Sequence, residues 1–86
     1  MGFSNLKAAL VAANDIATRE RAGLVVWNQM DVLWQAKSLT SLPLSDDESL
    51  DFIVFGPGKH PWPCSQAALE AWVSLVRSVA EKGRAA

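Results

Sequence analysis

The stretch of residues 65–83 constrains the fold most, because it carries the clearest helical pattern in the chain. Its apolar residues recur at the i, i+3, i+4, i+7 spacing that places side chains on one face of an α-helix. These apolar positions are Leu69, Trp72, Val73, Val76, Val79 and Ala80. Ser65 can cap the first turn, and Gly83 can take the left-handed conformation that ends a helix. The sequence therefore predicts a helix over residues 65–82 whose apolar face needs a covering surface.

A second amphipathic helix is predicted over residues 4–22, with Ser4 as its cap and Gly23 as its stop. Its apolar stripe consists of Leu6, Ala9, Leu10, Ala13, Ile16 and Ala17. Because half of these side chains are alanine, the helix can approach its neighbour closely but buries less apolar area than the C-terminal helix. We expect it to pack as a core helix.

Residues 24–37 fit two patterns. With a period of two they form two strands around a turn at residues 28–31, and with a period of 3.6 they form a helix. The short apolar run of residues 52–55 favours the strands, because a lone strand would leave its backbone groups unpaired. The turn lacks the glycine that tight hairpins prefer, which keeps a longer loop or a helix open.

Together these segments predict an α+β fold in one domain of residues 1–86. The expected order is α-β-β-β-α, with both helices packed on one face of a small antiparallel sheet. An α-α-β-α arrangement is the alternative.

Half of the residues are hydrophobic, which is the upper end of the ordinary range of about 45 to 50%. A chain of 86 residues buries only about 60 to 65% of its unfolded surface. We therefore expect some of its large aromatic rings to stay at least partly exposed or to be covered by another chain. These rings belong to Phe3, Trp27, Trp34, Phe52, Phe55, Trp62 and Trp72.

The charges and the cysteine content argue against several classes of protein. The net charge is −1 and the eight basic residues are scattered, whereas nucleic-acid binding relies on basic clusters. The single cysteine, Cys64, excludes an intrachain disulfide and fits a reducing compartment, so we expect a cytoplasmic protein. No apolar run reaches the ~18 residues of a membrane span, so no membrane partner is expected.

The loop at residues 56–64 is a candidate contact site. Its three prolines stiffen the chain around Trp62, and Lys59 and His60 lie just before this indole. A rigidly held aromatic ring can anchor a partner at little entropic cost. The same ring can instead fold over the core as a lid, and the sequence leaves both open.

The second candidate contact site is the only charge cluster, which includes Asp46, Asp47 and Glu48. Ser45 and Glu48 have the spacing of a capping box, so we predict a single helical turn here. Acidic residues suit such a turn, but they can also steer a basic partner.

Catalytic motifs are weak. The glycines and Lys59 do not have the spacing of a phosphate-binding loop. His60 and Cys64 stand four residues apart, and Pro61 and Pro63 lie between them, which disfavours a helical thiol–imidazole pair. One histidine and one cysteine do not supply the ligands of a zinc site, so neither a metal nor a cofactor is expected.

These observations predict a small non-enzymatic protein-binding module that acts as an inhibitor, adaptor or subunit. Its size and lack of catalytic chemistry would suit a phage or mobile-element inhibitor of a host protein complex. A homodimeric structural domain is the first alternative, and a small enzyme or cofactor-binding domain that uses Cys64 and His60 is the second. The expected contact residues are Lys59, His60 and Trp62, flanked by Asp46, Asp47 and Glu48.

Overall fold

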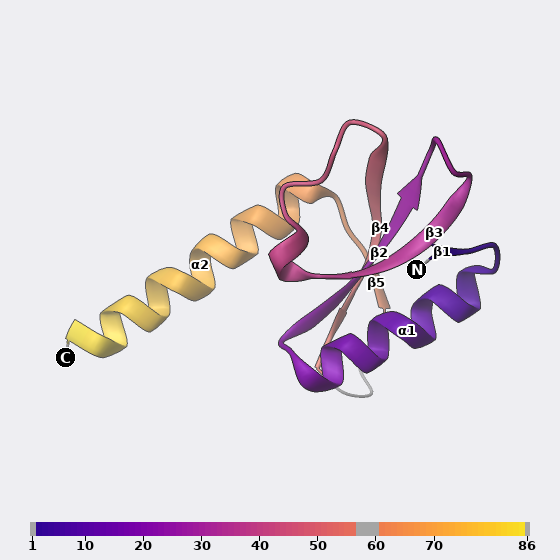
Figure 1. Cartoon of the computed structure of the whole chain (residues 1–86). Coiled ribbons are helices and arrows are strands. Elements are labelled where there is room, and N and C mark those ends of the chain that lie inside the picture. Colours follow the sequence, from indigo (N-terminus) through magenta and orange to yellow (C-terminus); the bar gives the residue numbers. More distant parts are fainter. Residues whose placement is uncertain (1, 57–60, 86) are drawn as a thin grey trace.

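The computed structural model describes residues 2–56 and 61–85, with side chains up to residue 79. It contains two helices and a five-stranded antiparallel sheet, which confirms the predicted α+β fold (Figure 1). The elements in chain order are β1 (Gly2–Phe3), α1 (Leu6–Arg19), β2 (Ala22–Asn28), β3 (Leu33–Ser38), the 3-10 helix η1 (Leu39–Ser41), β4 (Glu48–Phe55), β5 (Pro61–Pro63) and α2 (Gln66–Ala85).

The sheet has the strand order β1-β3-β2-β4-β5, and all neighbouring strands run antiparallel. The hairpin interpretation of residues 24–37 is confirmed, since β2 pairs with β3 along its length. The turn forms without glycine. The Asn28 side chain accepts a hydrogen bond from the Asp31 amide at 2.9 Å, and Val32 takes the left-handed conformation with φ 53°.

Helix α1 and the start of α2 pack on opposite faces of the sheet, so the expected placement of both helices on a single face is wrong. Ala9, Ala13 and Ala17 of α1 pack on one face against Val25 and Val54. Leu69 of α2 packs on the other face, in a cluster with Ala22, Leu24, Val26, Leu50 and Ile53. The reason lies in β2, whose consecutive apolar residues point to alternating faces, so that both faces need cover.

The ends of α1 differ from the prediction. Asn5 rather than Ser4 is the cap, because its side chain accepts a hydrogen bond from the Lys7 amide at 2.8 Å. The helix ends at Arg19, and Gly23 lies inside β2. A Cβ at Gly23 would lie 1.9 Å from the Ala13 carbonyl oxygen. This glycine therefore permits the close approach of helix and strand instead of ending the helix.

A β-bulge in β4 contacts both β3 and the segment just before α2. The register shifts so that Val25 faces Phe52 and Val26 faces Leu50, which leaves Asp51 as the extra residue. Its carboxylate accepts a hydrogen bond from Trp34 Nε1 at 3.0 Å, and its carbonyl accepts one from the Cys64 amide at 3.1 Å. The bulge therefore joins β3 to β4 and fixes the chain just before α2.

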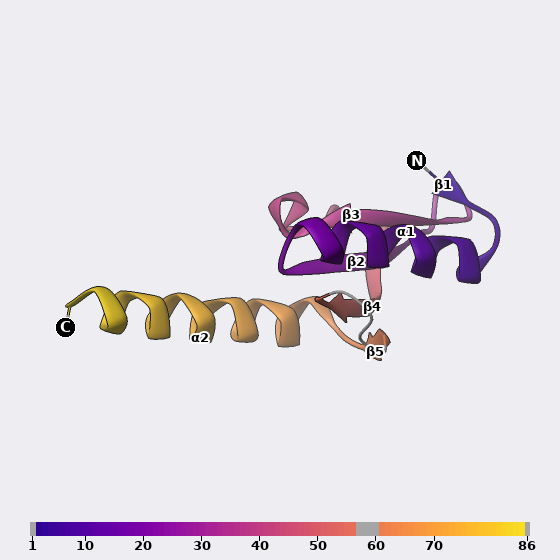
Figure 2. The same ribbon diagram turned by 90° about the horizontal axis from the view of Figure 1, so that it is seen from below.

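Helix α2 starts as predicted but continues further. The Ser65 hydroxyl accepts a hydrogen bond from the Ala68 amide at 3.2 Å, which confirms the cap. Gly83 does not end the helix, which runs to Ala85. Glycine costs only about 1 kcal/mol inside a helix, and its neighbours here are good helix formers. Beyond its first turns, α2 projects away from the sheet (Figures 1 and 2).

The expectation about aromatic rings is confirmed. None of the seven large rings is fully buried. Trp72 meets Phe55 edge-on at 4.7 Å between ring centroids, and Trp27 packs against Trp34 at the same distance. Trp62 is 62% exposed.

Candidate protein-docking surface

Trp62 lies at the edge of the sheet, in β5. It pairs with Ile53, so its side chain shares the face of the sheet that α2 covers. At 62% exposure the indole does not act as a lid over the core. Lys59 and His60, the other predicted contact residues of this loop, lie outside the described residues.

The outer edge of β5 lacks amide donors at its two prolines. The Cys64 amide donates to the Asp51 carbonyl of β4, and amide directions alternate along a strand. Pro61 and Pro63 therefore occupy the positions whose nitrogen faces outward, and proline has no hydrogen to donate. A partner that adds a strand here would find no amide donors at these two positions.

The residues of the predicted acidic cluster have different surroundings in the structure. Asp46 and Asp47 are exposed in a turn, whereas Glu48 forms an ion pair with Lys37. Glu48 also accepts hydrogen bonds from the Ser45 amide and hydroxyl. Only one contact of the capping box is present, the one from the Ser45 amide to the Glu48 carboxylate. The predicted helical turn is wrong, because the Glu48 amide donates to the Ser45 carbonyl and closes a turn that leads into β4.

Glu48 is held in its charged form. The hydrogen bond from Lys37 is the main reason that its pKa is lowered, and the Ser45 contacts act in the same direction against the effect of burial.

Trp62 lies far from the acidic residues. It pairs with Ile53, which is five residues beyond Glu48 on β4, a distance of about 17 Å along the strand. The structure thus does not gather Trp62 and the acidic residues into one patch.

Cys64 shows no sign of nucleophilic activation. Its thiol donates to the Ser65 carbonyl at 3.3 Å, and burial raises its pKa, which favours the neutral thiol. Within residues 2–56 and 61–85, no three histidine, cysteine, aspartate or glutamate side chains group as metal ligands.

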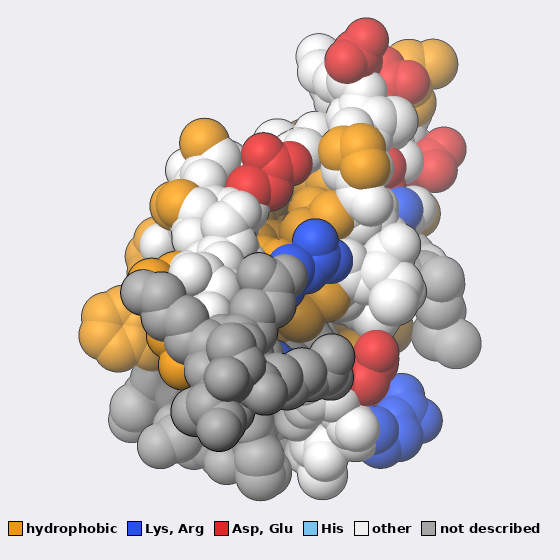
Figure 3. Space-filling model, turned by 90° about the vertical axis from the view of Figure 1, so that its left-hand side faces the viewer, with side chains coloured by type: hydrophobic (Ala, Val, Ile, Leu, Met, Phe, Trp, Pro, Cys, Tyr) orange, Lys and Arg blue, Asp and Glu red, His pale blue; other side chains and the backbone are white. Residues whose placement is uncertain are grey.

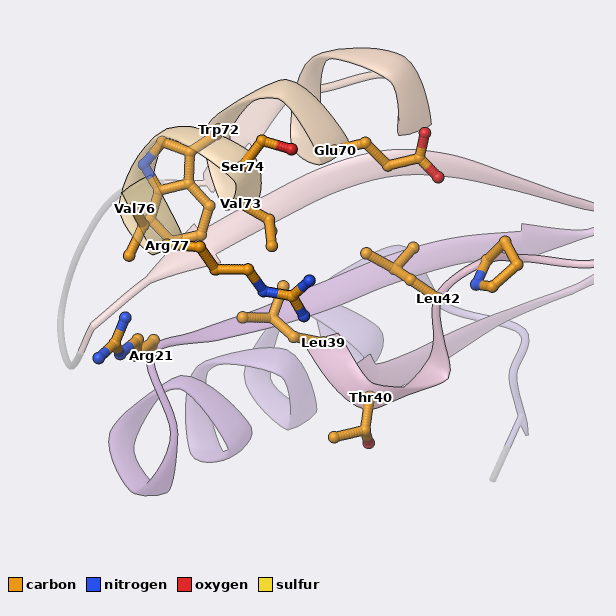
Figure 4. Close-up of a pocket in the computed structure, with 11 residues that line it drawn as sticks. Arg21, Leu39, Thr40, Leu42, Glu70, Trp72, Val73, Ser74, Val76 and Arg77 are labelled. Carbon is orange, nitrogen blue, oxygen red and sulfur yellow. The ribbon is translucent and has the colours of Figure 1, made fainter. Parts of the chain in front are cut away.

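A groove that no sequence pattern predicts runs between α2 and the segment around η1 (Figures 3 and 4). It has a volume of about 700 Å³. Leu39, Thr40, Leu42 and Pro43 form one wall, and Trp72, Val73 and Val76 line the α2 side. Hydrophobic side chains are visible at the floor of the hollow in Figure 3. Further along α2, Leu75 and Val79 are each 63% exposed.

Charged side chains border this groove. Arg21 lies toward one end and Glu70 toward the other, near Leu42, whereas the Arg77 side chain reaches into the middle of the groove beside Leu39 (Figure 4). Among the described residues neither arginine forms an ion pair, and Glu70 accepts a hydrogen bond from Gln66 at 3.1 Å. The groove therefore combines an apolar floor with both basic and acidic side chains.

The sequence shows the apolar stripe of α2 but not the groove, because the other wall of the groove comes from residues 39–43, where the sequence has no helical or strand periodicity.

Comparison of the chain with models of protein families, with curated proteins and with solved structures finds no match. Among the described helices, none is both long and apolar enough to cross a membrane.

Proposed function

We propose that the chain is a non-enzymatic protein-binding module that binds its partner through the α2 docking surface. We define this surface as the groove together with the apolar side chains of α2 beside it, which are Trp72, Val73, Leu75, Val76 and Val79, and with Leu39 and Leu42 of the facing wall. The observation that supports the proposal is the exposure of the outer half of an amphipathic helix, which ordinarily turns its apolar stripe toward a core.

The intramolecular packing of α2 is limited to its beginning. Leu69 is buried, Trp72 and Val73 are half-buried against the core cluster, and Val79 is exposed. An apolar stripe next to a groove is suited to another amphipathic helix, which binds by inserting apolar side chains at helical spacing. Burial of the stripe would also remove the surplus of apolar surface from water.

Trp62 is a second proposed contact. It is a large ring held between two prolines on the α2 side of the sheet, and such rings often contribute strongly to binding. Inhibitor, adaptor and subunit roles all use a surface of this kind, and the identity of the partner distinguishes them.

The test is retention of a stoichiometric partner on immobilised chain. Val79→Glu places a charge in the stripe and should abolish retention. Val11→Glu is the matched control, because Val11 is 58% exposed on α1, on the other face of the sheet. Circular dichroism should show that both variants remain folded. Retention that survives Val79→Glu, or that is lost equally in Val11→Glu, would contradict the proposal.

A further inference from the structure

The α2 docking surface carries both halves of one interface. One half is the groove between α2 and the η1 segment, whose lining combines apolar side chains with Glu70 and Arg77. The other half is the exposed outer part of α2, at Leu75 and Val79, which leaves apolar side chains in water. In a dimer with two-fold symmetry each copy offers the same patch to the other, so each projecting helix can enter the groove of the other copy.

The charges on α2 specify how two copies would align. Glu70 and Arg77 are seven residues apart, which is nearly two turns or about 10.5 Å along the axis. Their directions around the helix differ by only about 20°, so they lie on the same flank of the stripe. Both side chains border the groove (Figure 4).

An antiparallel pair of helices brings each flank against the same flank of the other copy. Glu70 then lies opposite Arg77 of the partner subunit, and the same contact recurs on the other side of the two-fold axis. In a parallel pair the two Arg77 side chains would lie at the same level along the helix axes, and Glu70 would not face Arg77 of the partner subunit.

We propose that the occupant of the groove is a second copy of this chain, bound through antiparallel α2 helices. The two-fold axis crosses α2 between Val73 and Ser74, midway between Glu70 and Arg77. This inference rests on the proposed function and specifies its partner. It places Val76 against Trp72 of the partner subunit and directs Val79 into the partner's groove.

The test is a charge swap followed by sedimentation equilibrium on the full chain. The wild-type chain should form a dimer. Glu70→Arg and Arg77→Glu should each raise the dissociation constant about tenfold, because each turns two attractive contacts into repulsive ones. The double variant should return to within about threefold of the wild type, because the pairs are restored with reversed sign. A double variant that dissociates more readily than either single variant overturns the antiparallel arrangement.

Val79→Glu and Val11→Glu complete the design. Val79→Glu should raise the dissociation constant about 100-fold, because a buried valine is lost twice in a symmetric dimer. Val11→Glu should leave it unchanged. Equal effects of the two variants, or a wild-type chain that stays monomeric up to about 1 mM, overturn the inference.

The retention experiment separates the two proposals. A monomeric chain that still captures another protein through Val79 refutes the second copy and leaves the proposed function standing. A monomeric chain that captures nothing refutes both. A dimer that dissociates with Val79→Glu supports the inference whether or not another protein is captured.

Discussion

The turn between β2 and β3 shows how a single residue can carry strain. Val32 has φ 53°, a conformation in which its branched side chain crowds the backbone. The side chain is exposed, so no core packing offsets this cost. The hairpin therefore forms despite this position.

Val32→Gly should raise the free energy of unfolding by about 1 kcal/mol, because glycine has no Cβ to clash in the left-handed region. Urea denaturation followed by tryptophan fluorescence measures the change. Met30→Gly is the matched control, since Met30 is exposed in the same turn and φ is not positive there. Equal or greater stabilisation by Met30→Gly would show that strain at Val32 is not the cause.

Glu48 should make stability depend on pH. Its pKa is lower in the folded chain than in the unfolded chain, mainly through the hydrogen bond from Lys37. Its contribution is therefore complete above the unfolded-state pKa and is lost as the pH falls through the folded-state pKa. Glu48→Gln should cost about 1 kcal/mol at neutral pH.

The stabilities of wild type and Glu48→Gln should converge in acid, where Glu48 is protonated in both folded and unfolded chains. Urea titrations at a series of pH values measure the difference. A constant difference across the acidic range would show that the charge of Glu48 does not stabilise the fold.

At the scale of elements, the sequence predicted the patterns of long segments and missed the short ones. The apolar stripes of α1 and α2, the hairpin at residues 24–37 and the strand at residues 52–55 all follow from periodicity and propensity. Strands β1 and β5 contain two and three residues, which is too short for a pattern to appear. Gly23 and Gly83 were both interpreted as helix stops, because the sequence does not show how closely α1 approaches β2 or how far α2 extends.

The candidate site was predicted only in part. Trp62 was recognised as an anchor or a lid, and its exposure required the strand pairing of β5 to be known. The sequence shows the acidic cluster, but it does not show that Glu48 is bound within the fold by Lys37. The groove joins segments about 30 residues apart, so local sequence patterns do not reveal it.

Helix α2 should divide into a part that stabilises the fold and a part that binds. Removal of residues 75–86 retains Leu69, Trp72 and Val73, which are the α2 contacts of the core cluster. The shortened chain should therefore keep its β-sheet and lose about 1 kcal/mol or less, while dimerisation is abolished. Circular dichroism and sedimentation check the two effects separately. Loss of the sheet would show that the projecting half of α2 is needed for folding.

At the scale of the molecule, the principal extents are 47 × 28 × 18 Å, and the projection of α2 accounts for the elongated outline in Figures 1 and 2. The sheet is covered on one face by α1 and on the other by the start of α2 and the η1 segment. Among the described residues, large hydrophobic side chains are exposed on α1, in the β2–β3 turn, on β5 and on α2, where Leu75 and Val79 belong to the docking surface. A second copy bound at α2 would cover Leu75 and Val79 without any change in the fold.

The most direct measurement is an isotope-filtered NOE experiment on an equimolar mixture of labelled and unlabelled chains, which reports only contacts between copies. The antiparallel dimer should give NOEs from the Val76 methyl groups of one copy to the Trp72 indole of the other. These signals should disappear in Val79→Glu and persist in Val11→Glu. A mixture that associates but shows no NOE between copies at α2, or shows Val76 in contact only with its own chain, would refute the proposed dimer.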